Sequence, residues 1–193
     1  MNPLVVAAFL ILSPVKTEHG RFTILKDGKK IGTEEFTIAM RESTYTVDGK
    51  LTMGQSTLSS RMELDQRLVP VSYEVANQEG RIRVLVSTPL SELQSFVGGE
   101  TSSADFRFPE GGIILDNNFF HHYLILLYRA QMGQSDFSVF VPQDRSLGSA
   151  VVRSAGTNMY ELHIGDIQMQ AATDAEGRLI RLTVPSANVV VER

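Results

Sequence analysis

One segment of the chain, residues 113–132 (IILDNNFFHHYLILLYRAQM), has the periodicity of a helix, whereas the rest reads as short strands. Its apolar residues recur every three to four positions, as on one face of an α-helix. Asp116 is the predicted N-cap, because a short carboxylate can accept hydrogen bonds from the unpaired amides of the first turn. Gly133 is the predicted stop, because glycine readily takes the left-handed conformation that ends a helix. The sequence therefore predicts one helix over about 116–131.

This predicted helix is apolar over more than half of its circumference. At about 100° per residue, its apolar residues cover an arc of roughly 200°, twice the stripe that a surface helix needs. The residues of the arc are Phe119, Phe120, Tyr123, Leu124, Leu126, Leu127, Tyr128 and Ala130. The remaining strip carries His121, His122, Ile125 and Arg129. We therefore expect a mostly buried helix with one narrow polar strip.

On both sides of the helix, apolar and polar residues alternate, which is the period of half-buried antiparallel strands. Phe36, Ile38 and Met40 show this alternation, and the Asp27-Gly28 pair before them is a strong hairpin signal. Several such segments are joined by short turns, so sequential neighbours should pair as a meander. We expect a mainly β fold with a single large curved antiparallel sheet, a half-barrel or open barrel, that encloses the one central helix.

The alternative architecture is a sandwich of two sheets in which the helix is a crossover. A crossover helix on an outer surface needs only a narrow apolar stripe, so the broad arc favours the enclosed helix. The length of 193 residues, with 42% hydrophobic and 21% charged residues, fits one soluble globular domain, placed at residues 18–193.

The N-terminus, residues 1–17, reads as a weak or truncated export signal. Its apolar run from Leu4 to Leu12 has the length of a signal-peptide core and is too short to span a bilayer. No cationic residue precedes the run and no clear cleavage motif follows it. The alternative is an ordinary first strand. We expect an exported protein of the periplasm or cell envelope, and a cytoplasmic one if the run is a strand.

Composition and missing motifs exclude several function classes. The net charge is -4 and no basic patch is visible, which argues against nucleic acid as a partner. The absence of cysteine excludes disulfides, thiol catalysis and zinc-cysteine sites. No phosphate loop, dinucleotide-binding glycine pattern or HExxH motif occurs. We therefore expect no cofactor, no metal site and no catalytic residue from a recognisable motif.

Two adjacent histidines are the most tempting candidates for a site. His121 and His122 diverge by about 100° on a helix, whereas a two-histidine metal site there needs the i, i+4 spacing. In a purely structural interpretation, one histidine bonds a strand carbonyl and the other meets solvent. In the functional interpretation, both line a ligand site.

Three further polar residues flank these histidines. Asn117 and Asn118 could bind a polar head group at the positive end of the helix, although capping and turn formation explain them as well. Arg129 could anchor a carboxylate or phosphate, although a surface cation at a helix C-terminus is an equally simple interpretation. The strip thus offers partners for an anionic or polar head group.

Three segments resemble uncharacterised bacterial envelope proteins of the domain-of-unknown-function type. They are the hairpin KDGKKIGTEE, the helix after DNN and the closing strand GRLIRLTVP. In general shape these proteins are similar to the LolA-type lipoprotein carriers, a half-barrel closed by helices. The resemblance covers most of residues 18–193 and implies a fold and a compartment rather than an activity. The chain differs from the lipoprotein members in having no cysteine to acylate.

The leading hypothesis is a non-enzymatic exported protein that encloses a lipid or other amphiphile between the sheet and the helix. The ligand-binding residues would be Asn117, Asn118, Phe119, His121, His122, Tyr123, Leu127 and Arg129. The alternatives are a structural or assembly module of the envelope with a fully packed core, and a hydrolase with an unrecognised site. A cavity beside the helix would favour the first, a solid interior the second and a convergent Ser-His-acid cluster the third.

Overall fold

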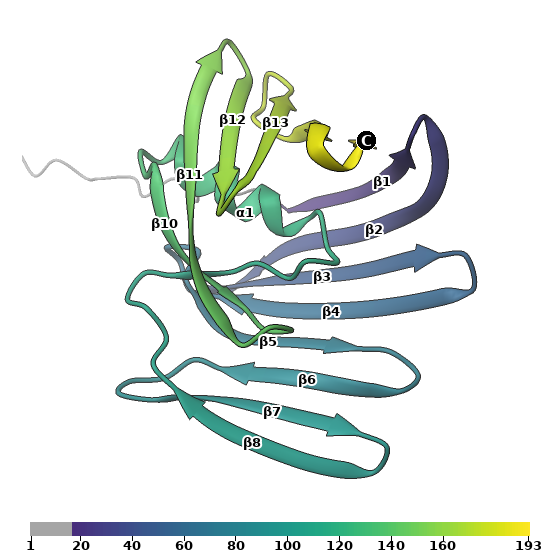
Figure 1. Cartoon of the computed structure of the whole chain (residues 1–193). Helices are drawn as coiled ribbons and strands as arrows, with labels where there is room; N and C mark the ends of the chain where they lie inside the picture. Colours follow the sequence, from purple (N-terminus) through teal and green to yellow (C-terminus); the bar gives the residue numbers. More distant parts are fainter. Residues whose placement is uncertain (1–16) are drawn as a thin grey trace, which may run out of the picture.

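The computed structural model of the protein describes residues 17–193, so the segment predicted as an export signal lies, but for Thr17, outside the described residues. These residues form one open, curved sheet of 15 strands and one α-helix, α1 (His122–Gln131) (Figure 1). The strands are β1 (Glu18–Lys26), β2 (Lys29–Arg41), β3 (Thr44–Met53), β4 (Ser56–Leu64), β5 (Pro70–Ala76), β6 (Gly80–Leu85), β7 (Ser91–Val97), β8 (Glu100–Phe106), β9 (Ile113–Ile114), β10 (Asp136–Val141), β11 (Ser146–Gly156), β12 (Met159–Ile164), β13 (Ile167–Thr173), β14 (Leu179–Val184) and β15 (Val189–Glu192). The mainly β fold predicted from the alternation is therefore confirmed.

The sheet is a meander whose first and last strands meet in its middle. Its order is β8-β7-β6-β5-β4-β3-β2-β1-β15-β14-β13-β12-β11-β10-β9. All pairs are antiparallel except β9 with β10. The β1–β2 hairpin turns at Asp27 and Gly28, both with positive φ, as the Asp-Gly signal predicts. Because β1 pairs with β15, the two halves form one sheet rather than a two-sheet sandwich.

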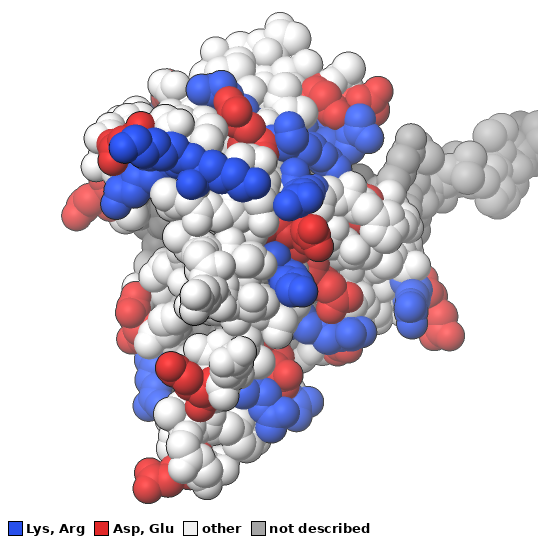
Figure 2. Space-filling view, turned by 90° about the vertical axis from the view of Figure 1, so that its right-hand side faces the viewer, with Lys and Arg blue, Asp and Glu red and all other residues white. Residues whose placement is uncertain are grey.

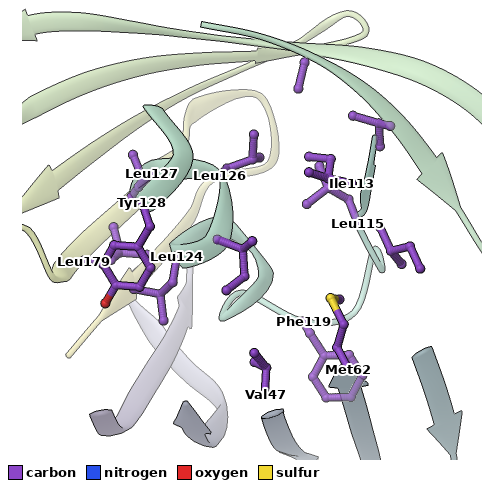
Figure 3. Packing of buried hydrophobic residues seen from close by; sticks show 14 of the residues in the cluster. Val47, Met62, Ile113, Leu115, Phe119, Leu124, Leu126, Leu127, Tyr128 and Leu179 are labelled. Carbon is purple, nitrogen blue, oxygen red and sulfur yellow. The ribbon is translucent and has the colours of Figure 1, made fainter. Parts of the chain in front are cut away.

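The two halves of this sheet curve toward each other, and α1 lies between them (Figure 1). Leu124, Leu126 and Leu127 of the helix are fully buried. Figure 3 shows them in one apolar cluster with residues from both halves, such as Val47 of β3 and Leu179 of β14. The predicted enclosed helix is confirmed. Among residues 17–193, no helix is long and apolar enough to cross a membrane.

The helix is shorter at its start than predicted. It begins at His122, because Asp116 is engaged elsewhere: its Oδ1 accepts hydrogen bonds from the backbone and side-chain nitrogens of Asn118 at 2.8 and 2.9 Å. Its Oδ2 accepts a hydrogen bond from Tyr73. These bonds hold residues 116–118 in a turn before the helix. At the other end, Gly133 has a φ of +98° and its amide bonds Ala130 at 2.9 Å, so the predicted stop is confirmed.

Candidate functional site

A buried carboxylate from β2 holds the start of α1. Glu34 is fully buried, and its Oε2 accepts a hydrogen bond from the amide of Phe120 at 2.8 Å. Its Oε1 accepts one from the amide of His121 at 2.7 Å and lies 2.7 Å from the Nδ1 atom of that residue. A negative charge suits the unpaired amides and the positive end of a helix. Glu34 therefore accepts the hydrogen bonds from the amides at the helix start, a role that the sequence predicted for Asp116.

Sequence reasoning missed Glu34, although a signal for it exists. In β2 it continues the phase of the inward-facing Phe36 and Ile38, so a strand pattern places an acid on the core face. An acid at such a position needs a buried partner. The identity of that partner, 87 residues further along the chain, is not visible in any local pattern.

A serine completes a line of three polar groups. Nε2 of His121 lies 3.5 Å from Oγ of Ser60 in β4. Gly49 of β3 pairs with Ser60 and makes room for the imidazole, because a Cβ at Gly49 would lie 2.2 Å from Cε1 of His121. Ser60, His121 and Glu34 thus stand in the order hydroxyl, imidazole, carboxylate that serine hydrolases use. Ser60 is only 6% exposed.

His122 is buried as deeply and makes a different contact. Its Nδ1 accepts a hydrogen bond from the amide of Asp116 at 3.1 Å, and its Nε2 has no hydrogen-bond partner. Its ring meets the ring of Tyr73 edge-on, with centroids 5.3 Å apart. Burial, and then the neighbouring His121, lower the pKa of His122 well below its usual value. The expectation that one histidine meets solvent is wrong, because the polar strip of α1 also faces the sheet.

Arg129 ties the end of α1 to the loop before β9. Its guanidinium donates hydrogen bonds to the carbonyls of Gly111 and Gly112, at 2.7 and 3.3 Å, and to Oε1 of Gln134 at 2.8 Å. The side chain is 5% exposed, and burial lowers its pKa. It also lines a surface pocket of about 350 Å³ with Arg67 and Glu110, which we call the Arg129 pocket. Most N–H groups of the Arg129 guanidinium therefore already donate hydrogen bonds to neutral acceptors within the protein.

A second pocket lies on the concave face of the sheet. It has a volume of about 220 Å³ and lies between the strands β4 to β7 and the β10–β11 turn, residues 142–145. We call it the inner pocket. Its wall includes Leu58, Val75, Ile82 and Val97, together with Asn118 and Gln143. Both amide atoms of the Gln143 side chain are buried without a hydrogen-bond partner.

A third pocket lies on the other side of the same turn. This outer pocket has a volume of about 350 Å³, and its apolar lining comprises Leu93, Ala104, Phe106, Phe140 and Leu147. The rings of Phe106 and Phe140 stack with centroids 4.3 Å apart. Arg107 and Arg145 and one acid, Asp105, complete the lining.

The residues predicted to bind a ligand do not converge on one cavity. Asn118 lines the inner pocket and Arg129 the Arg129 pocket. The exposed Asn117 bonds Asp144 in the β10–β11 turn at 3.3 Å. Phe119 and Leu127 are packed in the core, and the pKa of the part-buried Tyr123 is raised to about 12 by burial and then by Glu34. None of these last three residues lines the inner, outer or Arg129 pocket.

Charges of both signs are mixed on the surface. Figure 2 shows basic and acidic side chains interspersed over the face that it presents. Several form ion pairs across neighbouring strands, such as Arg61 with Asp48 at 3.5 Å and Arg81 with Glu74 at 3.8 Å. Residues 17–193 contain no group of three or more histidine, aspartate or glutamate side chains arranged to hold a metal ion.

Comparison with known proteins leaves the chain without an assigned function. No family model matches it, and no curated protein matches it. A solved structure, that of a DUF1089 family protein from Pseudomonas aeruginosa, is similar with a TM-score of 0.48 and 11% sequence identity. The alignment covers 96% of this chain and 98% of the other. The name of that family denotes a domain of unknown function.

Proposed function

We propose that this protein binds an amphiphilic, lipid-like ligand without catalysing a reaction, as an exported component of the cell envelope. The ligand would lie on the concave face of the sheet, in the groove between β5 to β8 and the β10–β11 turn. In the proposed arrangement the ligand spans the inner and outer pockets, and we call this proposed path the groove. The resemblance of sequence segments to envelope proteins supports the compartment.

The observation that carries the proposal is Gln143, which lines the inner pocket. Both polar atoms of its side-chain amide are buried and unpaired, and the strand residues in the same lining are Leu58, Val75, Ile82 and Val97 beside the charged Arg81. A buried polar group without a partner costs about 1–3 kcal/mol. A ligand with a hydroxyl, ester or amide group would satisfy Gln143, and its apolar part would cover Val75, Ile82 and Val97. This combination of a mostly apolar wall and a few polar groups is typical of small-molecule sites.

The two pockets also suit an elongated ligand. Leu93 lines the outer pocket and Val97 the inner one, and both belong to β7 on the same face of the sheet. Four residues of a strand span about 13 Å. The β10–β11 turn contributes Gln143 to the inner pocket and Arg145 to the outer one, so a ligand that spans both pockets would contact this turn. The apolar side chains beside the helix are packed, and this observation by itself favours the structural module. The ligand that we propose therefore lies in these two pockets and not beside the helix.

Calorimetric titration with dodecanol and dodecanoic acid tests the proposal. We expect binding by the wild type, and a loss of about tenfold in affinity for Val97→Asp and for Gln143→Ala, because each removes a favourable contact in the groove. Val71→Asp is the matched control, since Val71 is an exposed valine of β5 that lines neither pocket. No binding of either compound to the wild type would leave the structural module as the better interpretation.

The line of Ser60, His121 and Glu34 favours a second candidate function, hydrolysis of an ester. Ser60 pairs with Val75, which lines the inner pocket, although the buried Ser60 does not itself line that pocket. Labelling with a fluorophosphonate probe decides between the candidates. The binding protein that we propose stays unlabelled, whereas a hydrolase is labelled and Ser60→Ala abolishes the label.

A further inference from the structure

We propose that the outer pocket recognises an anionic head group, a carboxylate or a phosphate monoester, through Arg107 and Arg145. This proposal rests on the proposed function and specifies the class of amphiphile. Arg107 directly follows β8, and Arg145 ends the β10–β11 turn with a φ of +50°. Two segments distant in sequence thus bring one guanidinium each to the same pocket.

The charges around the pocket favour an anion. Among residues 17–193, neither Arg107 nor Arg145 has a carboxylate within ion-pair distance. Some arginines elsewhere on the surface, such as Arg61 and Arg181, are paired in this way, and others, such as Arg83, are not, so the pocket is distinguished by having two unpaired arginines together. Asp105 is the only acid in the lining of the outer pocket, so two positive charges face one negative charge. A planar guanidinium matches the geometry of carboxylate and phosphate oxygens.

The apolar lining of the pocket indicates that the anion carries a hydrocarbon chain. The stacked rings of Phe106 and Phe140 and the side chain of Leu93 line it. Leu147, also in the lining, is 61% exposed, so its side chain is accessible to a ligand in this pocket. A free inorganic anion would leave this surface uncovered, whereas an alkyl chain would bury it.

The test compares four probes on the full chain: dodecanoate, dodecyl phosphate, dodecanol and inorganic phosphate. The variants are Arg107→Gln/Arg145→Gln and the control Arg83→Gln/Arg153→Gln, which removes the same charge from two exposed arginines that line neither the inner nor the outer pocket. We expect the wild type and the control to bind at least one anionic dodecyl compound about tenfold more tightly than dodecanol. The variant should bind all dodecyl compounds with the affinity of dodecanol. Salt at 0.5 M should reduce the preference in the wild type, since exposed charges are screened.

The outcome of this test shows which of the two proposals fails. Equal affinities of the wild type for dodecanol and both anionic compounds overturn the head-group assignment and leave amphiphile binding intact, as does a preference that survives in the Arg107→Gln/Arg145→Gln variant. Inorganic phosphate that binds as tightly as dodecyl phosphate overturns the role of the chain. No binding of any dodecyl compound overturns both proposals together.

Discussion

At the scale of single residues, three polar side chains lie inside the core. Glu34, His121 and His122 are buried, and each contacts a group far away in sequence: Glu34 bonds His121, and His122 packs on Tyr73. Alternation along β2 is enough to predict that Glu34 faces the core. The partner of such a residue could not be predicted, because it depends on how the helix docks on the sheet. Stability and pH dependence are the measurements that report on these contacts.

Replacement of Glu34 should be costly. Glu34→Ala leaves two backbone amides and an imidazole nitrogen without their acceptor, so we expect a loss of about 3–5 kcal/mol in the free energy of unfolding. Glu35→Ala is the control, because Glu35 is exposed and its ion pair with Arg21 is long, at 3.9 Å. We expect a change of about 0.5 kcal/mol or less there. Urea denaturation of both variants measures the difference, and similar small losses would show that Glu34 does not anchor the helix.

His122 should make the stability depend on pH. The folded state resists protonation of this buried imidazole, whereas the unfolded chain takes up the proton near pH 6.5. Its contribution is therefore complete above pH 6.5 and is lost as the pH falls toward the lower pKa of the folded state, by up to about 1.4 kcal/mol per pH unit.

The variant His122→Asn isolates this effect. Asparagine keeps an acceptor for the amide of Asp116 but does not titrate, so the slope below pH 6.5 should become shallower than in the wild type. His19→Asn, at an exposed position, is the matched control for the loss of an imidazole. Denaturant titrations between about pH 4.5 and 8 measure both. An identical slope in His122→Asn and the wild type would assign the pH dependence to other groups.

At the scale of elements, the sequence predicts the type and the end of α1 better than its start. The broad apolar arc and Gly133 depend on local chemistry, and both are confirmed. The predicted start was Asp116, whereas the helix begins at His122. The carboxylate of Asp116 accepts hydrogen bonds from Tyr73 and Asn118, and Glu34 is the acceptor at the helix start instead. Local capping rules do not include tertiary partners of this kind. Contacts with residues of the sheet therefore determine where the helix begins.

Truncations in the helix measure how much it contributes to the core. Leu124→Ala and Leu127→Ala should each cost roughly 2–5 kcal/mol, because both side chains are fully buried between the halves of the sheet. Gln131→Ala should cost about 1 kcal/mol or less, since it removes one exposed hydrogen bond to Gly177. Thermal and urea denaturation compare the three. Equal small losses would place the helix outside the core.

At the scale of the whole molecule, the meander could be predicted and the groove could not. Hairpin signals such as Asp27-Gly28 fix neighbouring pairs of strands, whereas the pairing of β1 with β15 joins the two ends of the chain. The groove depends on this closure and on the curvature, which carry the β10–β11 turn over β5 to β8. Gln143, Arg107 and Arg145 therefore gave no signal in sequence, although each lies in a turn or next to a strand end.

The proposed compartment has its own test. If residues 1–17 act as an export signal, the protein recovered from its native host should begin between about Ser13 and Gly20, as expected from the usual length of such signals. N-terminal sequencing of that material measures this directly. An intact Met1 would contradict the cleaved export signal and remove this support for the proposed compartment.

Photo-crosslinking with a diazirine-bearing fatty acid, mapped by peptide mass spectrometry, tests the central claim most directly. The proposed groove predicts crosslinks in the segments that contain Phe106, Phe140 and Leu147, with further ones near Val97, and competition by unlabelled dodecanoate. Crosslinks at Phe119 or Leu127 would place the ligand beside the helix instead. Crosslinks scattered over exposed residues without competition would contradict a ligand site on this sheet.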